Sequence, residues 1–264
     1  MKKQNKQIGL LSFILYLFSQ TINAAPAPII TSTQGKSDTN SRFGIGITTS
    51  VAKRPFTGVD TQNASLPYLS YRHKDFYIEG LDLGYNFHKN KGFTVDLLAT
   101  PRFYEVKPSF ADGGELNGMD ATKETYFTGI SAQLNAHNMV YTFQVLHDAI
   151  ESNGNEITLQ LSKAFDVTSN FKLTPSIGLV NQDKTLVSHF YGVQAHEVKA
   201  GRPQYSGNNS LNYNATLNAS WDITKHFQLL GQVKYEKIGK GITDSPIVDK
   251  DTLNFFTLGI VYRY

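Results

Sequence analysis

Residues able to do acid–base or metal chemistry occur in this chain as isolated groups. His147 and Asp148 form an adjacent acid–base pair near an expected strand end. Neighbouring strand residues point to opposite faces, so these two side chains cannot form one site by themselves. His196-Glu197 lacks the second histidine at helical spacing that a zinc protease motif requires. We therefore expect polar rim and loop residues at these positions, with no catalytic residues and no metal site.

Three aspartates close together raise the question of a calcium site. Calcium takes about six to eight oxygen ligands, and the spacing of Asp244, Asp249 and Asp251 fits no EF-hand loop. We expect these carboxylates in a solvated outer loop, facing divalent ions shared with lipopolysaccharide. The chain has no cysteine and no Gly-x-Ser-x-Gly motif, and no glycine-rich phosphate loop follows a strand. We predict no cofactor.

The elements that must carry these residues are two-faced strands. A strand places alternate side chains on opposite faces, and in residues 211–222 one face is apolar while the other is almost wholly polar. The final segment does the same. The apolar faces comprise Leu211, Tyr213, Ala215, Leu217, Ala219 and Trp221, and then Phe256, Leu258, Ile260, Tyr262 and Tyr264. Such faces meet either the core of a soluble sheet or the lipid around an outer-membrane barrel.

The N-terminal segment is typical of a secretory signal peptide. Lys2, Lys3 and Lys6 precede an apolar run at residues 8–18 that is too short to span a bilayer, and we expect cleavage after Ala24. This divides the chain into a signal peptide (1–24), a flexible leader (25–41) and a barrel (42–264). The formal charge of +3 includes those three lysines. The mature chain is therefore near neutral, which argues against a nucleic-acid partner.

Strand-like runs recur along the chain with turn signals between them. The predicted strands are 42–53, 65–72, 75–80, 82–88, 92–104, 123–135, 138–148, 155–166, 170–181, 209–223, 226–238 and 252–264. About twelve strands result if the chain bends at Gly80, and a ten-stranded barrel is the alternative. The connections at 72–75, 88–92, 135–138, 166–170 and 222–226 are short. Most of the opposite ones (54–64, near Gly80, 105–122, 149–154, 182–208 and 239–251) are long, as expected for a closed antiparallel transmembrane β-barrel with short periplasmic turns and long outer loops.

Charged residues on the polar faces are candidates for the barrel lumen. Lys234 and Glu236 alternate with apolar residues in 226–238, and a charge costs little in a wet lumen but several kcal/mol in a dry core. The long 182–208 segment either folds into or over the lumen, where Lys199 and Arg202 would set charge selectivity, or forms a mobile surface loop. The candidate lumen or constriction residues are Lys199, Arg202, Gln232, Lys234 and Glu236.

Several short stretches, in their order and spacing, resemble one known family. They are residues 66–72 (LPYLSYR), 76–80 (FYIEG), 83–86 (LGYN), 191–193 (YGV), 201–205 (GRPQY), 244–248 (DSPIV) and 258–264 (LGIVYRY). Together they resemble the MltA-interacting protein (MipA/OmpV) family of Gram-negative outer-membrane proteins, over most of the mature chain.

The resemblance implies an outer-membrane location and two rival functions. One is a scaffold that brings a periplasmic murein hydrolase, a lytic transglycosylase, together with a bifunctional murein synthase. The other is a porin-like channel for small polar solutes. The implied partners are outer-membrane lipid and lipopolysaccharide and, for the scaffold, the two murein enzymes. The family offers no catalytic residues to carry over, so the resemblance implies that the chain is not an enzyme.

Overall fold

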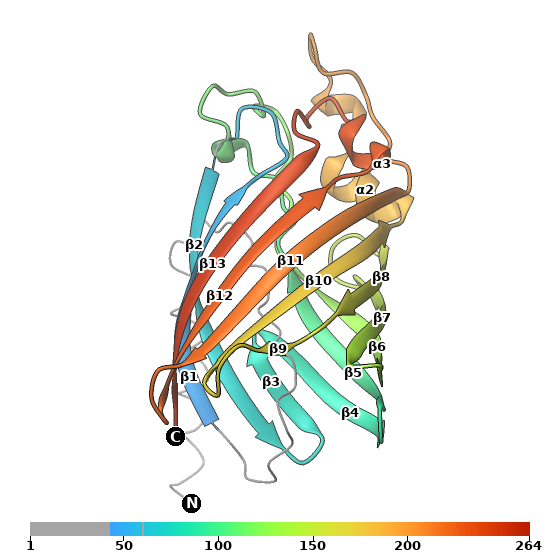
Figure 1. The fold of residues 1–264 in the computed structure, drawn as a ribbon. Helices are drawn as coiled ribbons and strands as arrows, with labels where there is room; N and C mark the ends of the chain where they lie inside the picture. Colours follow the sequence, from blue (N-terminus) through green and yellow to red (C-terminus); the bar gives the residue numbers. More distant parts are fainter. Residues whose placement is uncertain (1–42, 60) are drawn as a thin grey trace, which may run out of the picture.

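The computed structural model describes residues 43–59 and 61–264. The predicted signal peptide (1–24) and leader (25–41) lie outside the described residues. The strands are β1 Phe43–Lys53, β2 Thr61–His73, β3 Phe76–Gly80, β4 Asp82–Asn90, β5 Phe93–Arg102, β6 Thr125–Ala136, β7 Met139–His147, β8 Asn155–Ser162, β9 Phe165–Asp166, β10 Phe171–Gln182, β11 Ser210–Asp222, β12 Phe227–Lys237 and β13 Thr252–Arg263 (Figure 1). The short helices are η1 Pro108–Phe110, α2 Lys184–Tyr191, η2 Ala195–Glu197 and α3 Lys240–Thr243.

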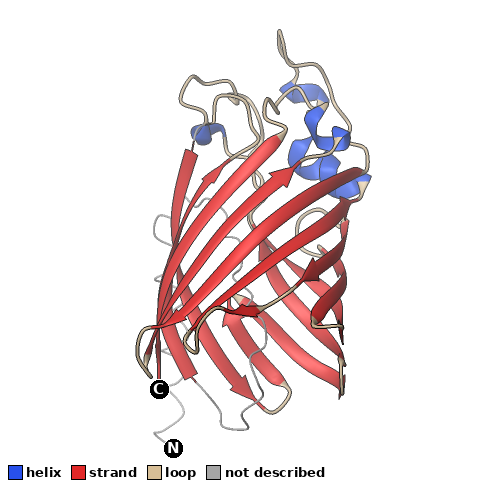
Figure 2. Cartoon of the chain, in the orientation of Figure 1, coloured by secondary structure: helices blue, strands red, loops and turns tan. Residues whose placement is uncertain are grey.

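Twelve of these strands close into one antiparallel barrel, and the two-residue β9 is an extra strand beside β10 (Figure 2). Consecutive strands pair as neighbours around the ring. Pairing of β1 with β13 over nine residue pairs joins the first and last strands of the chain, and pairing of β10 with β11 closes the ring. The predicted all-β closed barrel of twelve strands is confirmed, and the ten-stranded alternative is wrong.

The strands separate an apolar outer face from a buried inner face. In β13, Phe256, Leu258 and Ile260 are 47%, 55% and 43% exposed, whereas Thr257 and Val261 between and beside them are 0% exposed. Large exposed apolar residues follow the same alternation on the other long strands. This outward band is the surface that hydrocarbon solvates in an outer-membrane barrel. No helix among the described residues has the length and apolar character needed to cross a bilayer.

The rim that carries the chain's C-terminal end is built from tight turns (Figure 1). Two residues each separate β2 from β3, β4 from β5 and β6 from β7. His137 and Asn138 both have positive φ (54° and 58°), the backbone of a tight hairpin turn whose twist matches that of the strands. The opposite rim carries the long connections and every described helix. By this asymmetry the tight-turn rim is periplasmic and the loop-bearing rim faces outward.

The chain bends sharply at Gly80, as the strand count required. Gly80 has φ +64°, and Glu79 pairs with Asp82 across a hairpin that separates β3 from β4. A left-handed φ carries little penalty only for glycine. One long strand over residues 76–87 is therefore excluded.

A predicted strand over 155–166 is interrupted after Ser162, and the reason lies on its neighbour. The Lys163 N–H donates to the Pro175 carbonyl of β10 (3.2 Å). Pro175 has no N–H to return that hydrogen bond, so the ladder breaks there. Pairing with β10 resumes only at Phe165–Asp166, the short β9.

A charge on the outward face should destabilise the barrel in a depth-dependent way. Replacing Leu258 by Arg, in the middle of β13, should cost about 2–4 kcal/mol of unfolding free energy, because the guanidinium would lie in hydrocarbon. The same change at Ile223, in a periplasmic turn, should cost about 0–1 kcal/mol. Urea titration of the protein folded in lipid vesicles measures both. Equal costs at the two positions would contradict the lipid-facing assignment.

Candidate functional site at the outer mouth and in the lumen

The long outer connection between β10 and β11 begins as a helix, not as an irregular loop. Asp183 caps α2 by accepting a hydrogen bond from the Leu186 N–H (2.8 Å). The buried side chains of α2 are Leu186, Val187, Phe190 and Tyr191. An aspartate followed by apolar residues at this spacing is a helix signal in the sequence. The helix lies at the outer end of the barrel (Figure 1).

Three corners of the outer rim supply the residues that meet over the mouth. Arg54 and Phe56 follow β1, Tyr104 and Glu105 follow β5, and Tyr191 with its neighbour Phe190 follows β10. In the ring order, β1, β5 and β10 each lie four strands from the next. The corners are thus spaced by a third of the circumference, and a contact between any two of them runs across the mouth.

All three of these cross-mouth contacts are made. Arg54 Nη2 pairs with Glu105 Oε1 at 2.5 Å, the rings of Tyr104 and Phe190 lie 5.8 Å apart, and those of Phe56 and Tyr191 stack at 5.6 Å. Burial raises the pKa of Glu105, and the Arg54 guanidinium opposes that rise. Burial likewise raises the pKa of Tyr191. The mouth is therefore bridged by one ion pair and two aromatic pairs.

Around these contacts the outer loops and strand ends form an apolar core of their own, which we call the cap. Its members are buried and come from four outer connections and the adjoining strand ends, which lie far apart in the chain. The cap consists of Ala52, Phe56, Val59, Ala64, Val106, Phe110, Ala111, Leu116, Met119, Phe127, Leu146, Leu186, Val187, Phe190, Tyr191, Val193, Ile238, Ile242, Ile247, Leu253 and Phe255. Buried apolar packing of this kind stabilises soluble domains. Here it holds the loops over the barrel.

Arg202 and Lys199, two of the candidate constriction residues, lie in the outer loops. Arg202 is 4% exposed, and its guanidinium donates to the carbonyls of Glu197 (2.8 Å), Glu115 (3.1 Å) and Asn117 (3.0 Å). The exposed Lys199 donates to the Asn117 carbonyl at 3.4 Å. Both side chains tie residues 182–208 to residues 105–122. A role in charge selectivity stays a prediction.

Asp120, His196 and Glu197 form the one group of described residues whose donor atoms could share a metal ion, all within 4.8 Å of one another. His196 Nε2 lies 2.9 Å from Asp120 Oδ2. The two oxygens of Glu197 accept the backbone N–H groups of Asp120 and Gln194, each at 2.7 Å. Hydrogen bonds thus use both oxygens of the buried carboxylate to join two loops. The sequence singled out His196-Glu197 but not Asp120, which lies 76 residues from His196.

The three aspartates of the 239–251 loop have separate surroundings. Asp249 pairs with Lys250 at 3.2 Å, and Asp251 pairs with Lys237 at the end of β12. Asp244 lies just beyond α3, where it caps the helix end. These carboxylates do not gather into one ligand set among the described residues.

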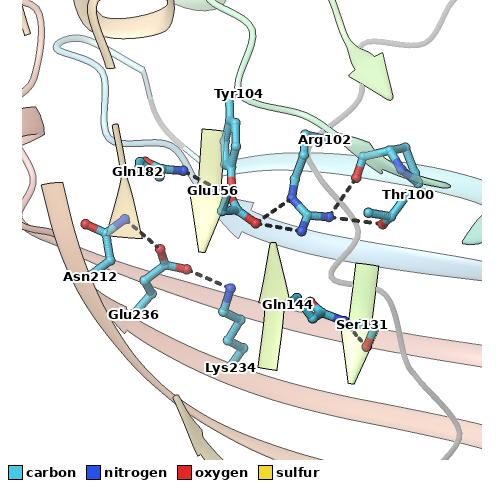
Figure 3. Close-up of polar contacts among 11 residues, drawn as sticks. Thr100, Arg102, Tyr104, Ser131, Gln144, Glu156, Gln182, Asn212, Lys234 and Glu236 are labelled. Carbon is cyan, nitrogen blue, oxygen red and sulfur yellow. Dashed lines mark hydrogen bonds and ion pairs between the residues drawn. The ribbon is translucent and has the colours of Figure 1, made fainter. Parts of the chain in front are cut away.

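Below the cap, an ion pair crosses part of the lumen between β5 and β8 (Figure 3). Arg102 donates through Nε (3.2 Å) and Nη2 (2.7 Å) to Glu156 Oε1. Tyr104 donates its hydroxyl to Glu156 Oε2 (2.7 Å), and Gln182 approaches the same oxygen at 3.4 Å. Charge-assisted bonds of this kind are the strong ones in proteins. Sequence reasoning missed Arg102 and Glu156, whose only signal was a polar residue on an inward face near a strand end.

The remaining candidate residues lie on the inward face of β12. Lys234 pairs with Glu236 at 2.7 Å and lies 5.2 Å above the Phe255 ring. Asn212 donates to the second oxygen of Glu236 (3.4 Å; Figure 3). Gln232 is buried and donates to Asn218 at 2.7 Å. Lys234 and Glu236 therefore present a neutral pair to the lumen, and their role at a constriction stays a prediction.

His147 and Asp148 have separate partners. His147 is exposed at the end of β7, with Nδ1 lying 3.0 Å from Asn155 Oδ1. Asp148 is fully buried and accepts hydrogen bonds from the Thr125 and Ser152 hydroxyls, both at 2.6 Å. Burial alone would raise the pKa of Asp148, but these bonds and the backbone N–H groups of 151 and 152 lower it to about 2. Asp148 thus organises the 148–154 loop.

This loop should lose stability in acid in a defined window. The Asp148 pKa is lower in the folded state than its unfolded value of about 3.9, so the stabilisation is present above about pH 4 and is lost as the pH falls through about 2. Asp148→Asn should therefore lower the hydrogen-exchange protection of the Ser152 amide at pH 6 by roughly tenfold or more. Wild type and variant should converge near pH 2. A difference that stays constant between pH 6 and pH 2 would contradict the assignment.

The chain is similar in sequence to known outer-membrane proteins. The family model described as MltA-interacting protein MipA matches residues 45–264. The MltA-interacting protein of Escherichia coli K12 is 24% identical over 243 residues, covering 89% of this chain and 96% of that protein. Outer membrane protein OmpV of Vibrio cholerae is 24% identical over 206 residues, with 78% and 79% covered.

Among solved structures, an outer-membrane channel from Pseudomonas putida F1 aligns with 89% of this chain and 99% of its own length, at a TM-score of 0.47 and 8% sequence identity. The family match covers both the barrel strands and the loops that form the cap. The resemblance seen in the short stretches of sequence is thereby confirmed, and so is the outer-membrane location. The chain belongs to the MltA-interacting protein (MipA) family of outer-membrane β-barrel proteins.

Proposed function

We propose that this protein is a capped outer-membrane scaffold that binds murein-remodelling enzymes at its periplasmic side and catalyses no reaction itself. The observation that carries the proposal is the set of three cross-mouth contacts, spaced by a third of the ring, that lies beneath the outer loops. The name of the Escherichia coli relative, MltA-interacting protein, supports a binding role for this chain.

The capped mouth favours a scaffold over a general pore. A porin lumen is a water-filled channel that must stay open at both ends. Here the Arg54–Glu105 pair is almost fully withdrawn from water, and its neighbours are apolar rings. Opening a route between the corners would expose that core to water, at a cost of about 25 cal/mol for each Å² of apolar surface.

A porin-like channel for small polar solutes is the second candidate, and a specific observation favours it. The lumen below the cap carries two charged pairs, Arg102–Glu156 and Lys234–Glu236 (Figure 3). A barrel whose only task is to anchor a partner has no evident need for such charges. Movement of the cap would connect these pairs to the outside. The two candidates therefore differ in whether the cap opens.

Single-channel recording in planar bilayers separates the candidates. The wild-type protein should give no discrete conductance steps, because the cap closes the mouth. Phe190→Ala with Tyr191→Ala, which removes both aromatic pairs, should give flickering conductance. Tyr213→Ala with Phe256→Ala removes the same side chains from the lipid face and is the matched control, expected to stay silent. Stable steps in the wild type that change with Lys234→Gln would overturn the capped scaffold in favour of the channel.

Photo-crosslinking in intact cells tests the binding partner. A photoreactive residue in place of His137 or Thr168, both exposed in periplasmic turns, should yield adducts that contain a murein hydrolase or synthase. The same residue in place of Gln204, exposed in an outer loop, should not. Mass spectrometry of the adducts identifies the partner. Repeated absence of any murein enzyme from the adducts of both turn positions would count decisively against the scaffold.

A further inference from the structure

The periplasmic rim carries a concentrated positive charge. We define this rim as residues 72–75, 88–92, 135–138, 163–172 and 222–226 together with Arg263, that is, the short turns and the strand ends beside them. Its cations outnumber its three aspartates (Asp75, Asp166 and Asp222). They are Arg72, Lys74, Lys89, Lys91, Lys163, Lys172, Lys225 and Arg263. The side chains of the rim therefore carry a net charge of +5.

The opposite end of the barrel has the opposite sign. Among the described residues of the outer connections (54–59, 103–124, 148–154, 183–209 and 238–251), eight lysines and arginines face twelve aspartates and glutamates, a net charge of −4. The whole chain is nearly balanced apart from its N-terminal lysines. The excess of cations is thus a local property of the periplasmic side. Like charges held close together repel one another, so a partner of opposite charge is the simplest reason to keep them.

The cations at the turns are available to a partner. Lys74, Lys91 and Lys225 lie in the turns between β2 and β3, β4 and β5, and β11 and β12, and all three are exposed. Lys89, at the end of β4, is exposed as well. Within the part of the chain that the structure describes, none of these four lysines has an ion-pair or hydrogen-bond partner for its ammonium group. Arg263 and Lys172, by contrast, pair with rim aspartates at 3.6 and 3.7 Å.

The spacing of the turns points to the kind of partner. Each tight turn offers only two to four residues, and the turns are distributed around the ring. A stable protein–protein interface buries about 800 Å² on each partner, so a globular enzyme would have to span several of the described turns at once. A flexible polymer with a charge on each repeat can contact several separated cations at once and gain from multivalency. Lysine carries a compact charge on a flexible stem, so its ammonium group can pair with carboxylates in many orientations.

We propose that the periplasmic rim is a docking surface for the cell-wall polymer itself, and that its lysines bind the free carboxylates of the wall's stem peptides. This inference deepens the proposed scaffold function and rests on it, because the scaffold function gives the barrel a reason to bind the cell wall. The rim holds the polymer at the membrane, where enzymes bound to the scaffold act on it. Binding is electrostatic, made of several weak contacts, and therefore sensitive to salt.

Co-sedimentation with purified, protein-free sacculi tests the proposal. Detergent-solubilised wild-type protein should sediment with sacculi in 50 mM NaCl, and the bound fraction should fall by about fivefold in 500 mM NaCl. The variant Lys74→Glu, Lys91→Glu, Lys225→Glu should lose about tenfold in apparent affinity. The matched control is Lys123→Glu, Lys184→Glu, Lys240→Glu, which makes the same change of charge at exposed outer-loop lysines. The control should bind as wild type does.

A second measurement keeps the test independent of variant folding. Soluble poly-glutamate should compete with sacculi for the unaltered protein, whereas neutral poly-glutamine should not. Equal binding by the rim variant and wild type would overturn the proposal. If the wild-type protein binds phosphatidylglycerol vesicles but not sacculi, the rim binds lipid headgroups, and this result would also overturn the proposal. The purified sacculi carry no protein. Failure of the enzyme crosslinking experiment would therefore contradict the scaffold function but would not change the sacculus-binding result.

Discussion

The structure depends on one constraint: every backbone N–H and C=O within the hydrocarbon layer needs a partner from the protein. The antiparallel sheet meets it by closure, with β1 paired to β13 over nine residue pairs. Closure fixes the rest of the pattern. Each strand must present one face to lipid and one to the lumen, so the two-residue period in the sequence has a single interpretation once the ring is closed. A residue such as Pro175, which cannot donate, breaks the ladder on one side and leaves β9 as a separate fragment.

Closure also determines how charged side chains inside the ring are paired. Charged side chains inside the ring need partners of opposite charge. The closed ring brings such side chains within reach of one another from different sides. Arg102 reaches Glu156 from three strands away, and Arg54 reaches Glu105 from four strands away. Above them the cap is packed as a soluble core is, with apolar side chains from the outer connections and strand ends. The molecule thus combines a lipid-solvated barrel with a small water-excluding domain made from the loops between its strands.

The sequence was sufficient for features that depend on near neighbours. The alternation from Leu211 to Trp221 predicted a two-faced strand, and Gly80 marked the bend that sets the count at twelve. The cap could not be predicted from the sequence because its contacts join residues that are far apart in the chain. Arg54 and Glu105 are separated by 51 positions, and Arg202 and Glu115 by 87. No pattern within one window can reveal such pairs. The helix α2 lies between these cases. Its signals, Asp183 and the spacing of Leu186, Val187, Phe190 and Tyr191, are present in the sequence, although residues 182–208 as a whole are predicted from the sequence to form a loop.

The two ends of the barrel differ in the physical means by which they can act. The outer end buries most of its large apolar side chains in the cap, with Ile150 and Val198 left exposed, and its described connections carry a net negative charge. At the periplasmic end, the described turns have two to four residues each, so each turn offers little surface by itself. Apolar contact with a single turn contributes little to binding, because that contribution scales with the buried area. Charge acts across a Debye length of about 8 Å at physiological salt. Electrostatic attraction by exposed lysines such as Lys74 and Lys225 is therefore a means of binding that needs no large contact area on the side where the cell wall lies.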